Sequence, residues 1–490
     1  MKLIERGSRA AIVVALLAGT SATASAQNVA FANAPKQTPL QAKYFTWENE
    51  AGGLKCATKG KLQELVGDPN KCYLDLDECP PALAALQGKL DADMVALFGD
   101  LITHDDKGDK PTFTAACPGV NGPQFTHLLG FKGVGYAKAT QYTDAVLGLV
   151  TKARIDKAGQ NIRSAVTDTL WLLGDKAKAV PALKDLVEYD TRNSDYKHPA
   201  LQALGAWKSD AAVAYCTNAL TAEKDGRLVD SCIMYLGAVG SSAAYDKMIR
   251  VMEKHDDYVV RALGSLGEKK AIKVLEQYIA DHEAVSDKRL AAVVSLINLG
   301  EDKHMAELEM CLQGEKPLTT KQKEKAAEKA AKAKAKGKAV KPEKPKKADE
   351  KLVQMAAMES VRVTNEKVAK RLTTALQAAA KAKDAKAWKG YLYATVALAQ
   401  RGDAGAVKAL IGELESPTEN IRTAVIDTIG GRYDVPHSNF MNRGLGVVAD
   451  ASLLPAVFNY YANEPKQAAK TKALKAAANI RATADARAAK

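Results

Sequence analysis

Two acidic clusters near the N-terminus contain residue types that bind metal ions. They are Asp75-Leu76-Asp77-Glu78 and His104-Asp105-Asp106. A calcium-binding loop places oxygen ligands at its positions 1, 3 and 5, a glycine at position 6 and a glutamate at position 12. Neither cluster supplies this frame. We therefore expect solvated acids that cap a helix or a turn, and we predict no metal site and no cofactor.

The cysteines could form disulfides or a second kind of metal site. Six could form disulfides, four in the N-terminal segment and two on consecutive predicted helices: Cys56, Cys72, Cys79, Cys117, Cys216 and Cys232. The first four allow three pairings, and the sequence does not choose between them. A zinc site is the less favoured alternative for these four, because their spacings lack a C-x2-C pair. The last two either bridge one helical hairpin or are ordinary buried apolar residues. Cys311 is left over if the other six pair.

Catalytic motifs of known classes do not occur in this sequence. It has no G-x-S-x-G elbow, no phosphate-binding P-loop and no H-E-x-x-H motif. The turn-rich stretch 431–450 contains Tyr433, His437 and Phe440, which form a possible recognition loop. The alternative is a structural loop that covers the end of a helical array. We predict that the chain is not an enzyme.

The elements that must position these residues are helices. Glycines follow Leu-containing segments at intervals of 30 to 33 residues, at Gly174, Gly205, Gly237, Gly267 and Gly300. A period of that size is typical of helix pairs stacked into an α-solenoid, in which each unit needs its neighbours to bury its apolar face. Glycine suits the position after a helix end, because it tolerates a positive φ angle.

Apolar periodicity predicts helices on both sides of a Lys-rich insert. Before the insert, the predicted pairs are 139–155 with 160–173, 176–189 with 196–206, 210–222 with 227–239, 242–254 with 257–266, and 269–281 with 286–299, followed by 302–312. After it, the predicted helices are 352–380, 385–400, 404–414, 421–429 and 453–461. The low aromatic content of 6% suits closely packed helices. We predict an all-α fold.

Particular residues recur within this pattern. They are Ile162-Arg163 with Ala165-Val166 and Leu173-Gly174-Asp175, Val260-Arg261-Ala262 with Leu266-Gly267, and Arg289 with Ala291-Ala292 and Leu299-Gly300. Residues 161–169 also return with few changes at 420–428. The pattern resembles HEAT repeats, in particular the short type found in phycobilin lyase subunits and deoxyhypusine hydroxylase. The resemblance implies a right-handed α-solenoid, and it specifies architecture better than activity.

The resemblance also implies roles for individual residues. An arginine near the start of the second helix and an aspartate within it would tie adjacent repeats together, with ligand contact as the alternative. The residues at these positions are Arg163, Asp168, Arg261, Arg289, Arg422 and Asp427. Deoxyhypusine hydroxylase holds two irons with several His-Glu dipeptides, whereas this chain has one, His282-Glu283. A di-iron centre needs several converging ligands, so the metalloenzyme interpretation is disfavoured.

The first 26 residues are typical of a secretory signal peptide. Basic residues precede the apolar run Ala10–Ala18, and Ala24-Ser25-Ala26 forms a cleavage motif. No later segment approaches a transmembrane span. We expect an exported chain, periplasmic or secreted, in a compartment where disulfides persist.

Positive charge is concentrated outside the predicted repeats. The formal net charge is +13, of which 315–351 contributes +8, the tail 464–490 contributes +5 and the signal-like segment contributes +2. The remainder is therefore near −2, and this charge argues against a nucleic-acid partner on electrostatic grounds. The insert lacks large apolar residues and is predicted to be a disordered linker, with a transient helix over 321–336. It is either a spacer or a tether to an anionic surface.

These observations divide the chain into six predicted segments. They are a signal peptide (1–26), an irregular Cys-containing cap or module (27–135), HEAT-like repeats (136–314), a Lys/Ala/Pro-rich disordered linker (315–351), continued repeats (352–463) and a basic Ala-rich tail (464–490), which is either a marginal helix or disordered. We expect a non-catalytic scaffold of the bacterial cell envelope that binds another envelope protein. The alternative is an enzyme or enzyme-accessory protein, lyase-like or metal-binding, with its site in the N-terminal module or in 431–450.

Overall fold

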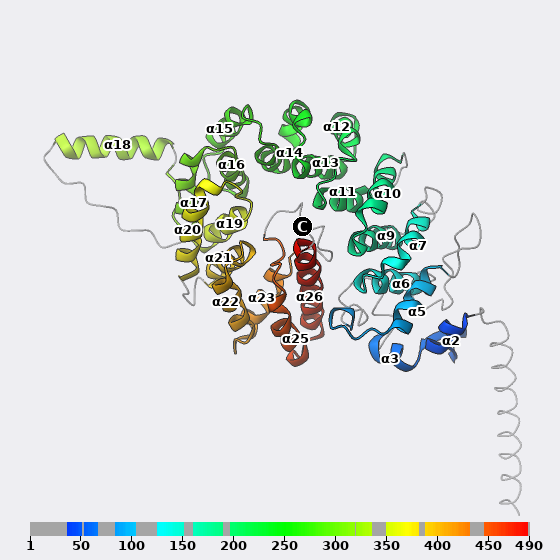
Figure 1. Cartoon of the computed structure of the whole chain (residues 1–490). Helices are drawn as coiled ribbons and strands as arrows, with labels where there is room; N and C mark the ends of the chain where they lie inside the picture. The colour runs from blue at the N-terminus through cyan, green and yellow to red at the C-terminus, as the bar shows by residue number, and fades with distance from the viewer. Residues whose placement is uncertain are drawn as a thin grey trace, which may run out of the picture. The chain divides into compact units, whose positions relative to one another are not determined.

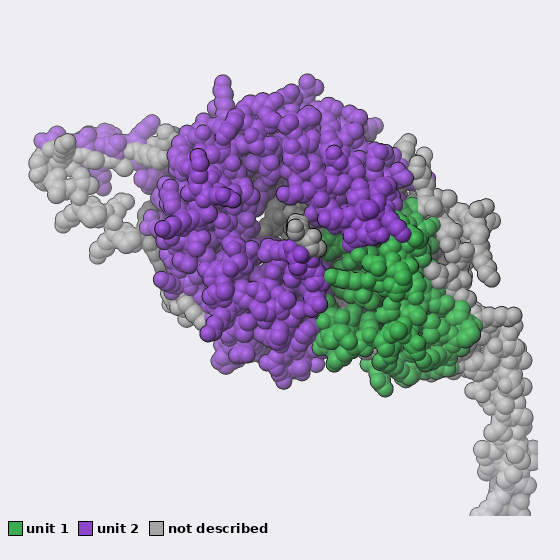
Figure 2. All heavy atoms as spheres, in the orientation of Figure 1, with its two compact units in different colours: residues 1–173 green, residues 174–490 purple. Residues whose placement is uncertain are grey.

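The computed structural model describes residues 37–50, 53–66, 84–103, 125–150, 160–189, 197–318, 320–335, 349–381, 388–431 and 445–488. The predicted signal peptide and both acidic clusters lie outside these residues. The described part of the chain is almost entirely helical and contains one two-stranded sheet, which confirms the all-α class. It forms two compact units, Met1–Leu173 and Gly174–Lys490 (Figures 1 and 2). None of the described helices is long and apolar enough to cross a membrane.

The first unit combines a small hairpin with short helices. Its elements are α2 (Pro39–Tyr44), β1 (Phe45–Glu50), β2 (Gly53–Thr58), α3 (Gly60–Val66), α5 (Ala92–Thr103), α6 (Phe125–Tyr136), α7 (Thr143–Leu149) and α9 (Gln160–Leu173). The strands pair antiparallel with Phe45 opposite Thr58. Helix α6 packs between α5 and α9. At Gly133 of α6 the Phe98 ring leaves no room for a β-carbon, so glycine permits the close approach of α5.

Helix α5 starts later than the spacing of apolar residues indicates. In the sequence, Leu86, Leu90, Met94, Leu97 and Leu101 recur three or four residues apart, which favours one helix over 81–101, but α5 begins at Ala92. Gly88 adopts a φ of +69°, which interrupts the helical turn before it. Asp91 then caps α5, because its carboxylate accepts a hydrogen bond of 2.9 Å from the Met94 amide. The spacing of apolar residues thus predicted the buried face of α5 but did not predict the turn at Gly88.

The second unit is a long succession of helices. They are α10 (Lys176–Glu188), α11 (Lys197–Ala206), α12 (Val213–Ala222), α13 (Gly226–Val239), α14 (Tyr245–Leu266), α15 (Ala271–Asp281), α16 (Asp287–Asn298), α17 (Met305–Leu312), α18 (Thr320–Ala335), α19 (Glu350–Ser360), α20 (Ala369–Lys381), α21 (Trp388–Gln400), α22 (Ala404–Leu414), α23 (Glu419–Ile429), α25 (Leu454–Asn463) and α26 (Gln467–Ala488). Neighbours in the chain pack as pairs, such as α12 with α13 and α15 with α16.

A continuous line of contacts links eight helices of this unit. It runs through α11, α13, α14, α16, α19, α21, α23 and α26, each packed on the next (Figure 1). We call these helices the stacked series. Each member therefore buries apolar surface against helices of other pairs as well as against its own partner.

One predicted helix boundary agrees with the structure, and another predicted helix is divided. The break predicted between segments 242–254 and 257–266 is present as a kink inside α14, at the non-helical angles of His255 (φ −126°, ψ 27°). Segment 352–380 was predicted as one helix but is two, α19 and α20. The break is stabilised by Asn365, whose side chain accepts a hydrogen bond from the Lys367 amide at 3.0 Å.

The C-terminal segment is a packed helix. Its composition predicts a marginal helix or disorder, yet α26 packs on both α23 and α25. Ala473, Ala477 and Ile480 are fully buried. Tertiary packing therefore stabilises a sequence whose helical propensity alone would be marginal.

The repeat glycines have two different roles. Three follow helix ends with positive φ angles: Gly174 (+75°), Gly267 (+74°) and Gly300 (+97°). Gly205 and Gly237 lie inside α11 and α13, so their predicted role as helix stops is wrong. A β-carbon at Gly237 would lie 2.9 Å from Cβ of Ala262, so this glycine permits close packing of α13 on α14.

Helices α14 and α16 approach most tightly at Gly264. A β-carbon there would lie 2.6 Å from Cα of Ser295, whose hydroxyl donates to the Val260 carbonyl at 2.6 Å. We expect Gly264→Ala to lower the free energy of unfolding by about 1–3 kcal/mol, because the backbone of α16 must move. Chemical denaturation measures the change. Gly412→Ala is the matched control in open space inside α22, and it should stabilise by about 0.5–1 kcal/mol. Equal effects of the two variants would contradict the packing argument.

The Lys-rich insert leaves and rejoins the second unit at one point. The Asp349 amide donates to the Gly314 carbonyl at 3.1 Å, and Lys316 pairs with Asp349 at 3.2 Å. The helix predicted over 321–336 is present as α18, and every side chain described on it is exposed. Residues 336–348 lie outside the described residues. Helices α16 and α17 pack directly on α19, so the stacked series continues across the insert.

Removal of this insert should leave the fold intact. We expect replacement of 317–347 by four Gly and Ser residues to keep the melting temperature unchanged or to raise it slightly. The replacement makes the loop roughly eightfold shorter. This lowers the entropic free-energy cost of closing the loop by about 2 kcal/mol at most. Thermal unfolding followed by circular dichroism tests this. A fall of several degrees would mean that the insert stabilises the helices around it.

Candidate functional site

A buried carboxylate connects the helices on the two sides of the insert. Arg261 of α14 is 2% exposed, and its Nη2 donates to Oε1 of Glu359 in α19 at 2.6 Å. Its Nη1 donates to the backbone carbonyl of Asp257 at 2.6 Å. Arg362 donates to Oε2 of Glu359 at 2.9 Å and to the Arg261 carbonyl at 2.9 Å. Glu359 therefore holds two guanidinium groups at once.

Two other predicted linking arginines also contact neighbouring helices. Arg289 of α16 makes a two-pronged ion pair with Glu307 of α17, with distances of 2.7 Å (Nε to Oε1) and 3.0 Å (Nη2 to Oε2). Arg422 of α23 donates to the Ser416 carbonyl at 2.7 Å, and its Nη2 lies 3.9 Å from Glu464. These groups join successive elements of the second unit.

The remaining residues with a predicted linking role differ in their surroundings. Asp427 of α23 pairs with Lys472 of α26 at 2.9 Å. Asp168 lies half-buried in α9. Arg163 belongs to the same helix, but its side chain is outside the described part of the structure. The link between Asp427 and Lys472 was not foreseen, because the sequence places Lys472 in an appended tail.

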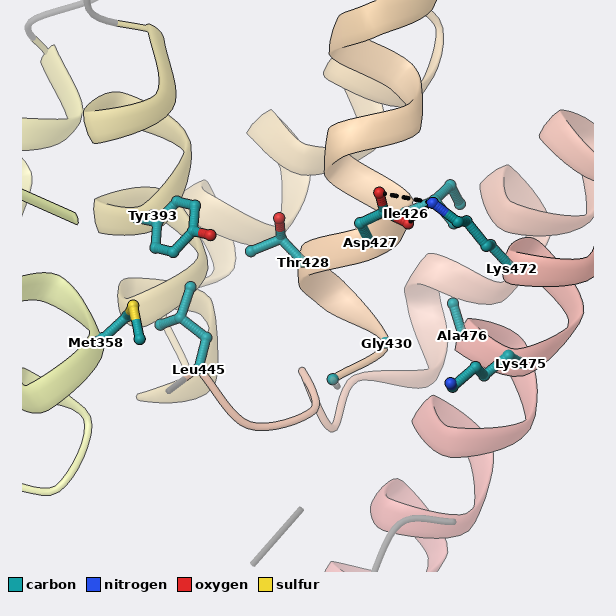
Figure 3. A pocket seen from close by; sticks show the side chains of 11 residues that line it. Met358, Tyr393, Ile426, Asp427, Thr428, Gly430, Leu445, Lys472, Lys475 and Ala476 are labelled. Carbon is teal, nitrogen blue, oxygen red and sulfur yellow. Dashed lines mark hydrogen bonds and ion pairs between the residues drawn. The ribbon is translucent and has the colours of Figure 1, made fainter. Parts of the chain in front are cut away.

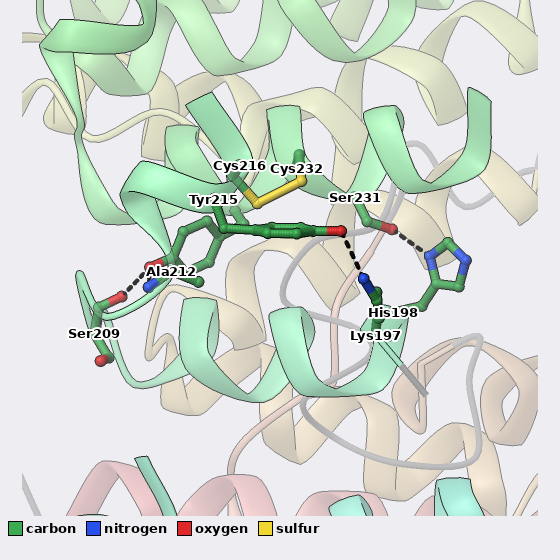
Figure 4. The surroundings of a disulfide bond; sticks show 9 residues. Lys197, His198, Ser209, Ala212, Tyr215, Cys216, Ser231 and Cys232 are labelled. Carbon is green, nitrogen blue, oxygen red and sulfur yellow. Dashed lines mark hydrogen bonds between the residues drawn. A yellow bond between two sulfur atoms is a disulfide. The ribbon is translucent and has the colours of Figure 1, made fainter. Parts of the chain in front are cut away.

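The hairpin of α12 and α13 is closed by a disulfide. Cys216 and Cys232 are bonded, with Cα atoms 4.9 Å apart (Figure 4). Of the two interpretations of this pair, the bridge is therefore correct. The Tyr235 hydroxyl donates to the Ser209 carbonyl at 2.7 Å and accepts from the Ala212 amide at 3.0 Å. Burial raises the pKa of Tyr235 to about 12, so the phenol stays protonated and keeps this tie.

The other cysteines contribute no described bridge. Cys72, Cys79 and Cys117 lie outside the described residues, and the side chain of Cys56 in β2 is likewise not described. Cys311 is a free, buried thiol in α17. Burial raises its pKa to about 12, which suppresses the reactive thiolate.

The single His-Glu dipeptide ends a helix. The His282 ring stacks on Tyr278 with centroids 4.0 Å apart, and its Nδ1 lies 2.8 Å from the Tyr278 carbonyl oxygen. Within the described ranges, no three His, Cys, Asp or Glu side chains are close enough to hold a metal ion. His282 is thus engaged in local contacts of α15.

A cavity of about 310 Å³ lies among α11, α13 and α14. On one wall, Nδ1 of His198 and Oγ of Ser231 are 2.9 Å apart (Figure 4). Asp230, the preceding residue, pairs with Nδ1 of His255 at 2.6 Å. Two histidines thus approach consecutive residues of α13 from different helices. We call this space the α11–α13 cavity.

The chemistry of the α11–α13 cavity favours binding over nucleophilic catalysis. A serine–histidine contact activates the serine only when a third group orients the ring and donors stabilise an oxyanion. Ser231 lies in the middle of α13, where backbone amides are used by the helix itself. The lining side chains of Gln202, Arg227 and Tyr258 instead provide hydrogen-bonding groups for a polar partner.

A larger cavity of about 430 Å³ lies among α19, α21, α23 and α26. Met358, Tyr393 and Leu445 line it together with Lys472 and Lys475 (Figure 3). We call it the α23–α26 cavity. Sequence reasoning missed it, because its cationic wall belongs to the predicted tail.

The two described ends of the predicted recognition loop border this cavity. Tyr433, His437 and Phe440 lie outside the described residues. The described ends of the loop, Gly431 and Leu445, line the α23–α26 cavity. The predicted loop and the cavity therefore share these two residues.

His304 provides a pH-dependent contribution to stability. Burial lowers the pKa of its imidazole, and Oε1 of Glu276 lies 4.0 Å from its Nε2. The unfolded chain therefore takes up this proton at a higher pH than the folded chain does. The stabilising contribution is complete above the unfolded pKa of about 6.5 and is lost as pH falls toward the folded value.

We expect His304→Gln to weaken the pH dependence of unfolding between pH 7.5 and 5. One proton accounts for at most about 1.4 kcal/mol per pH unit. Denaturant titrations at several pH values measure the slope. His282→Gln, at an exposed position, is the control that should preserve it. An unchanged slope in His304→Gln would refute the assignment.

Comparison with protein-family models and with curated proteins finds no match to this chain.

Proposed function

We propose that this protein is a non-catalytic scaffold that binds another protein of the bacterial cell envelope through the surface of a HEAT-like α-solenoid. The observation that carries the proposal is the stacked series, in which eight helices contact one another in succession. Such an array offers a surface made from many similar units, over which contacts with a partner are distributed.

The residue types at the cavities of the stacked series support a protein partner. Met234 and Tyr258 line the α11–α13 cavity, and Met358 and Tyr393 line the α23–α26 cavity. All four side chains are partly exposed. Methionine and tyrosine are enriched at protein interfaces, because they provide large contact areas with adaptable or amphipathic groups. Both halves of the stacked series thus offer contact residues.

Export is part of the proposal and has its own support. The disulfide of Cys216 and Cys232 suits an oxidising compartment, since cytosolic thiols are normally kept reduced. The residues with signal-peptide character precede the described chain. A periplasmic or secreted location accounts for both features.

Site-specific crosslinking in the native envelope tests the proposal. A photoreactive amino acid at Tyr258 or Tyr393 of the full-length protein should give a discrete adduct with one partner. The same probe at Lys408, exposed on α22, is the control and should not give that adduct. Equal labelling from all three positions would contradict binding by the stacked series.

The exposed lysines of α18 support a second contact, with an anionic surface. Salt screens such attraction, so the intact protein should be released from isolated envelopes at lower salt once 317–347 are replaced. Identical salt profiles would leave the insert with the role of a spacer.

The alternative function is that of an enzyme or enzyme-accessory protein. It is favoured by one observation, the position of Gly431 and Leu445 at the α23–α26 cavity. Stoichiometric iron or zinc in the purified protein would favour this alternative over the scaffold.

A further inference from the structure

One face of α13 supplies most of the lining of the α11–α13 cavity. Arg227, Asp230, Ser231 and Met234 follow one another at the spacing i, i+3, i+4 and i+7, which places them on the same side of the helix. Two residues of α11 and Tyr258 of α14 complete the lining. Side chains from three helices therefore converge on a volume of about 310 Å³.

This face of α13 is held in place by bonds to its neighbours. Cys232 directly follows Ser231 and is joined to Cys216 of α12 by the disulfide. Asp230 is bound to His255 of α14, with 2.6 Å between Oδ1 and Nδ1. The lining is thus fixed before any ligand arrives, which reduces the entropy cost of binding.

The lining combines hydrogen-bond donors with acceptors. The guanidinium of Arg227 only donates, the carboxylate of Asp230 only accepts, and the side chains of Gln202 and Ser231 do both. Each of these groups forms more than one hydrogen bond, so Ser231 is not saturated by its contact of 2.9 Å with His198 (Figure 4). A ligand adds bonds here and needs none of these side chains to lack a partner within the protein.

This mixture of groups disfavours three classes of ligand. An anion would meet the carboxylate of Asp230, and a cation would meet the guanidinium of Arg227. An apolar ligand would take water away from all the polar groups of the lining without replacing its hydrogen bonds. A neutral ligand rich in hydroxyl groups avoids all three costs, because each hydroxyl both donates and accepts.

We propose that the α11–α13 cavity binds a small neutral polyhydroxylated ligand, namely one or two sugar rings. The hydroxyls of a sugar match the mixed donors and acceptors, and its C–H groups match the apolar surfaces of Met234 and Tyr258. The cavity volume is at the lower end of the range for ligand sites, which begins near about 300 Å³. This site goes beyond the proposed scaffold role and does not depend on it.

Titration of the full-length protein with sugars that differ in charge tests the proposal. The neutral probes are glucose and N-acetylglucosamine, and their charged counterparts are glucuronate and glucosamine. We expect each neutral sugar to bind saturably and at least threefold more tightly than its charged counterpart, and cyclohexanol not to bind saturably. Equal or tighter binding of the charged sugars, or no saturable binding of any neutral sugar used, would overturn the proposal.

Methyl resonances of the methionines locate the bound sugar. In full-length protein with labelled methionine methyl groups, the resonance of Met234 should shift during the titration, and Met234→Leu assigns it. Met358 lines the other cavity and serves as the control, so its resonance should stay in place. A shift of Met358 without a shift of Met234 would place the sugar elsewhere and contradict the assigned site.

Variants of the lining separate specific binding from general adsorption. Arg227→Ala and Gln202→Ala each remove hydrogen-bonding groups and should weaken binding of the neutral sugars at least threefold. Arg250→Ala removes an exposed arginine of α14 outside the lining and should bind like the wild type. Matching melting temperatures establish that each variant is folded. Unchanged binding in both lining variants, or an equal loss in Arg250→Ala, would contradict the assignment.

Two longer probes identify the source of the sugar. Cellobiose and chitobiose are the disaccharides of the two neutral probes. Tighter binding of a disaccharide than of its monosaccharide would assign the cavity to the end of a glycan chain, and the reverse would assign it to a free sugar. Either result supports the shared chemistry.

Discussion

Glu359→Gln is expected to lower the free energy of unfolding by about 3–5 kcal/mol, the range for loss of one member of a buried ion pair. The wild-type carboxylate is 3% exposed and accepts hydrogen bonds from Arg261 and Arg362. A neutral amide removes the charge that both guanidinium groups share, and Asp257, 3.2 Å from Nη1 of Arg261, is then the described carboxylate that remains beside them. Chemical denaturation, with the midpoint and slope fitted for each variant, measures the loss.

A surface ion pair provides the control for Glu359→Gln. Glu309 pairs with Arg371 at 2.6 Å, but the arginine side chain is 50% exposed. Water screens this interaction, so Glu309→Gln should cost less than about 1 kcal/mol. Similar losses from the two substitutions would show that the buried pair contributes no more than a surface pair.

The local elements of this fold were largely predictable from sequence. Helices α10 to α17 and α21 to α23 lie close to the predicted segments, because their apolar residues recur at helical spacing. Gly267 and Gly300 also marked helix ends correctly. The chain adopts a positive φ angle after each of these helices, and this conformation depends only on the residues next to it. The errors at Gly205 and Gly237 have a different cause. The same residue type also serves close packing between helices, and one sequence does not distinguish the two uses.

Contacts between residues far apart in the chain could not be predicted from the sequence. Arg261 was assigned a linking role by resemblance, but its partner Glu359 lies 98 residues away, beyond the insert. Likewise, the composition of α26 gave no sign of packing. Ala476 of this helix lies against Gly430, which lets α23 come close, and this contact depends on two segments together. The α23–α26 cavity is lined by residues of both helices, so sequence reasoning did not predict it.

Loss of the disulfide should have the second large effect on stability. The bonded Cys216 and Cys232 are separated by 16 residues, and closure of a loop of about 15 residues contributes roughly 3 kcal/mol by restricting the unfolded chain. We therefore expect the double variant Cys216→Ser, Cys232→Ser to unfold at a lower denaturant concentration, with a loss of about 3 kcal/mol.

Reduction of the wild type provides the test that needs no substitution. Dithiothreitol should lower its unfolding midpoint toward that of the double variant, and any shift that it causes in the double variant should be smaller. The free Cys311 should not interfere, because burial keeps it protonated in the folded chain. If reductant shifts both proteins equally, the stabilising bond lies elsewhere in the chain. If it shifts neither, the bridge between α12 and α13 contributes nothing to stability, and the support it gives to an exported location is removed.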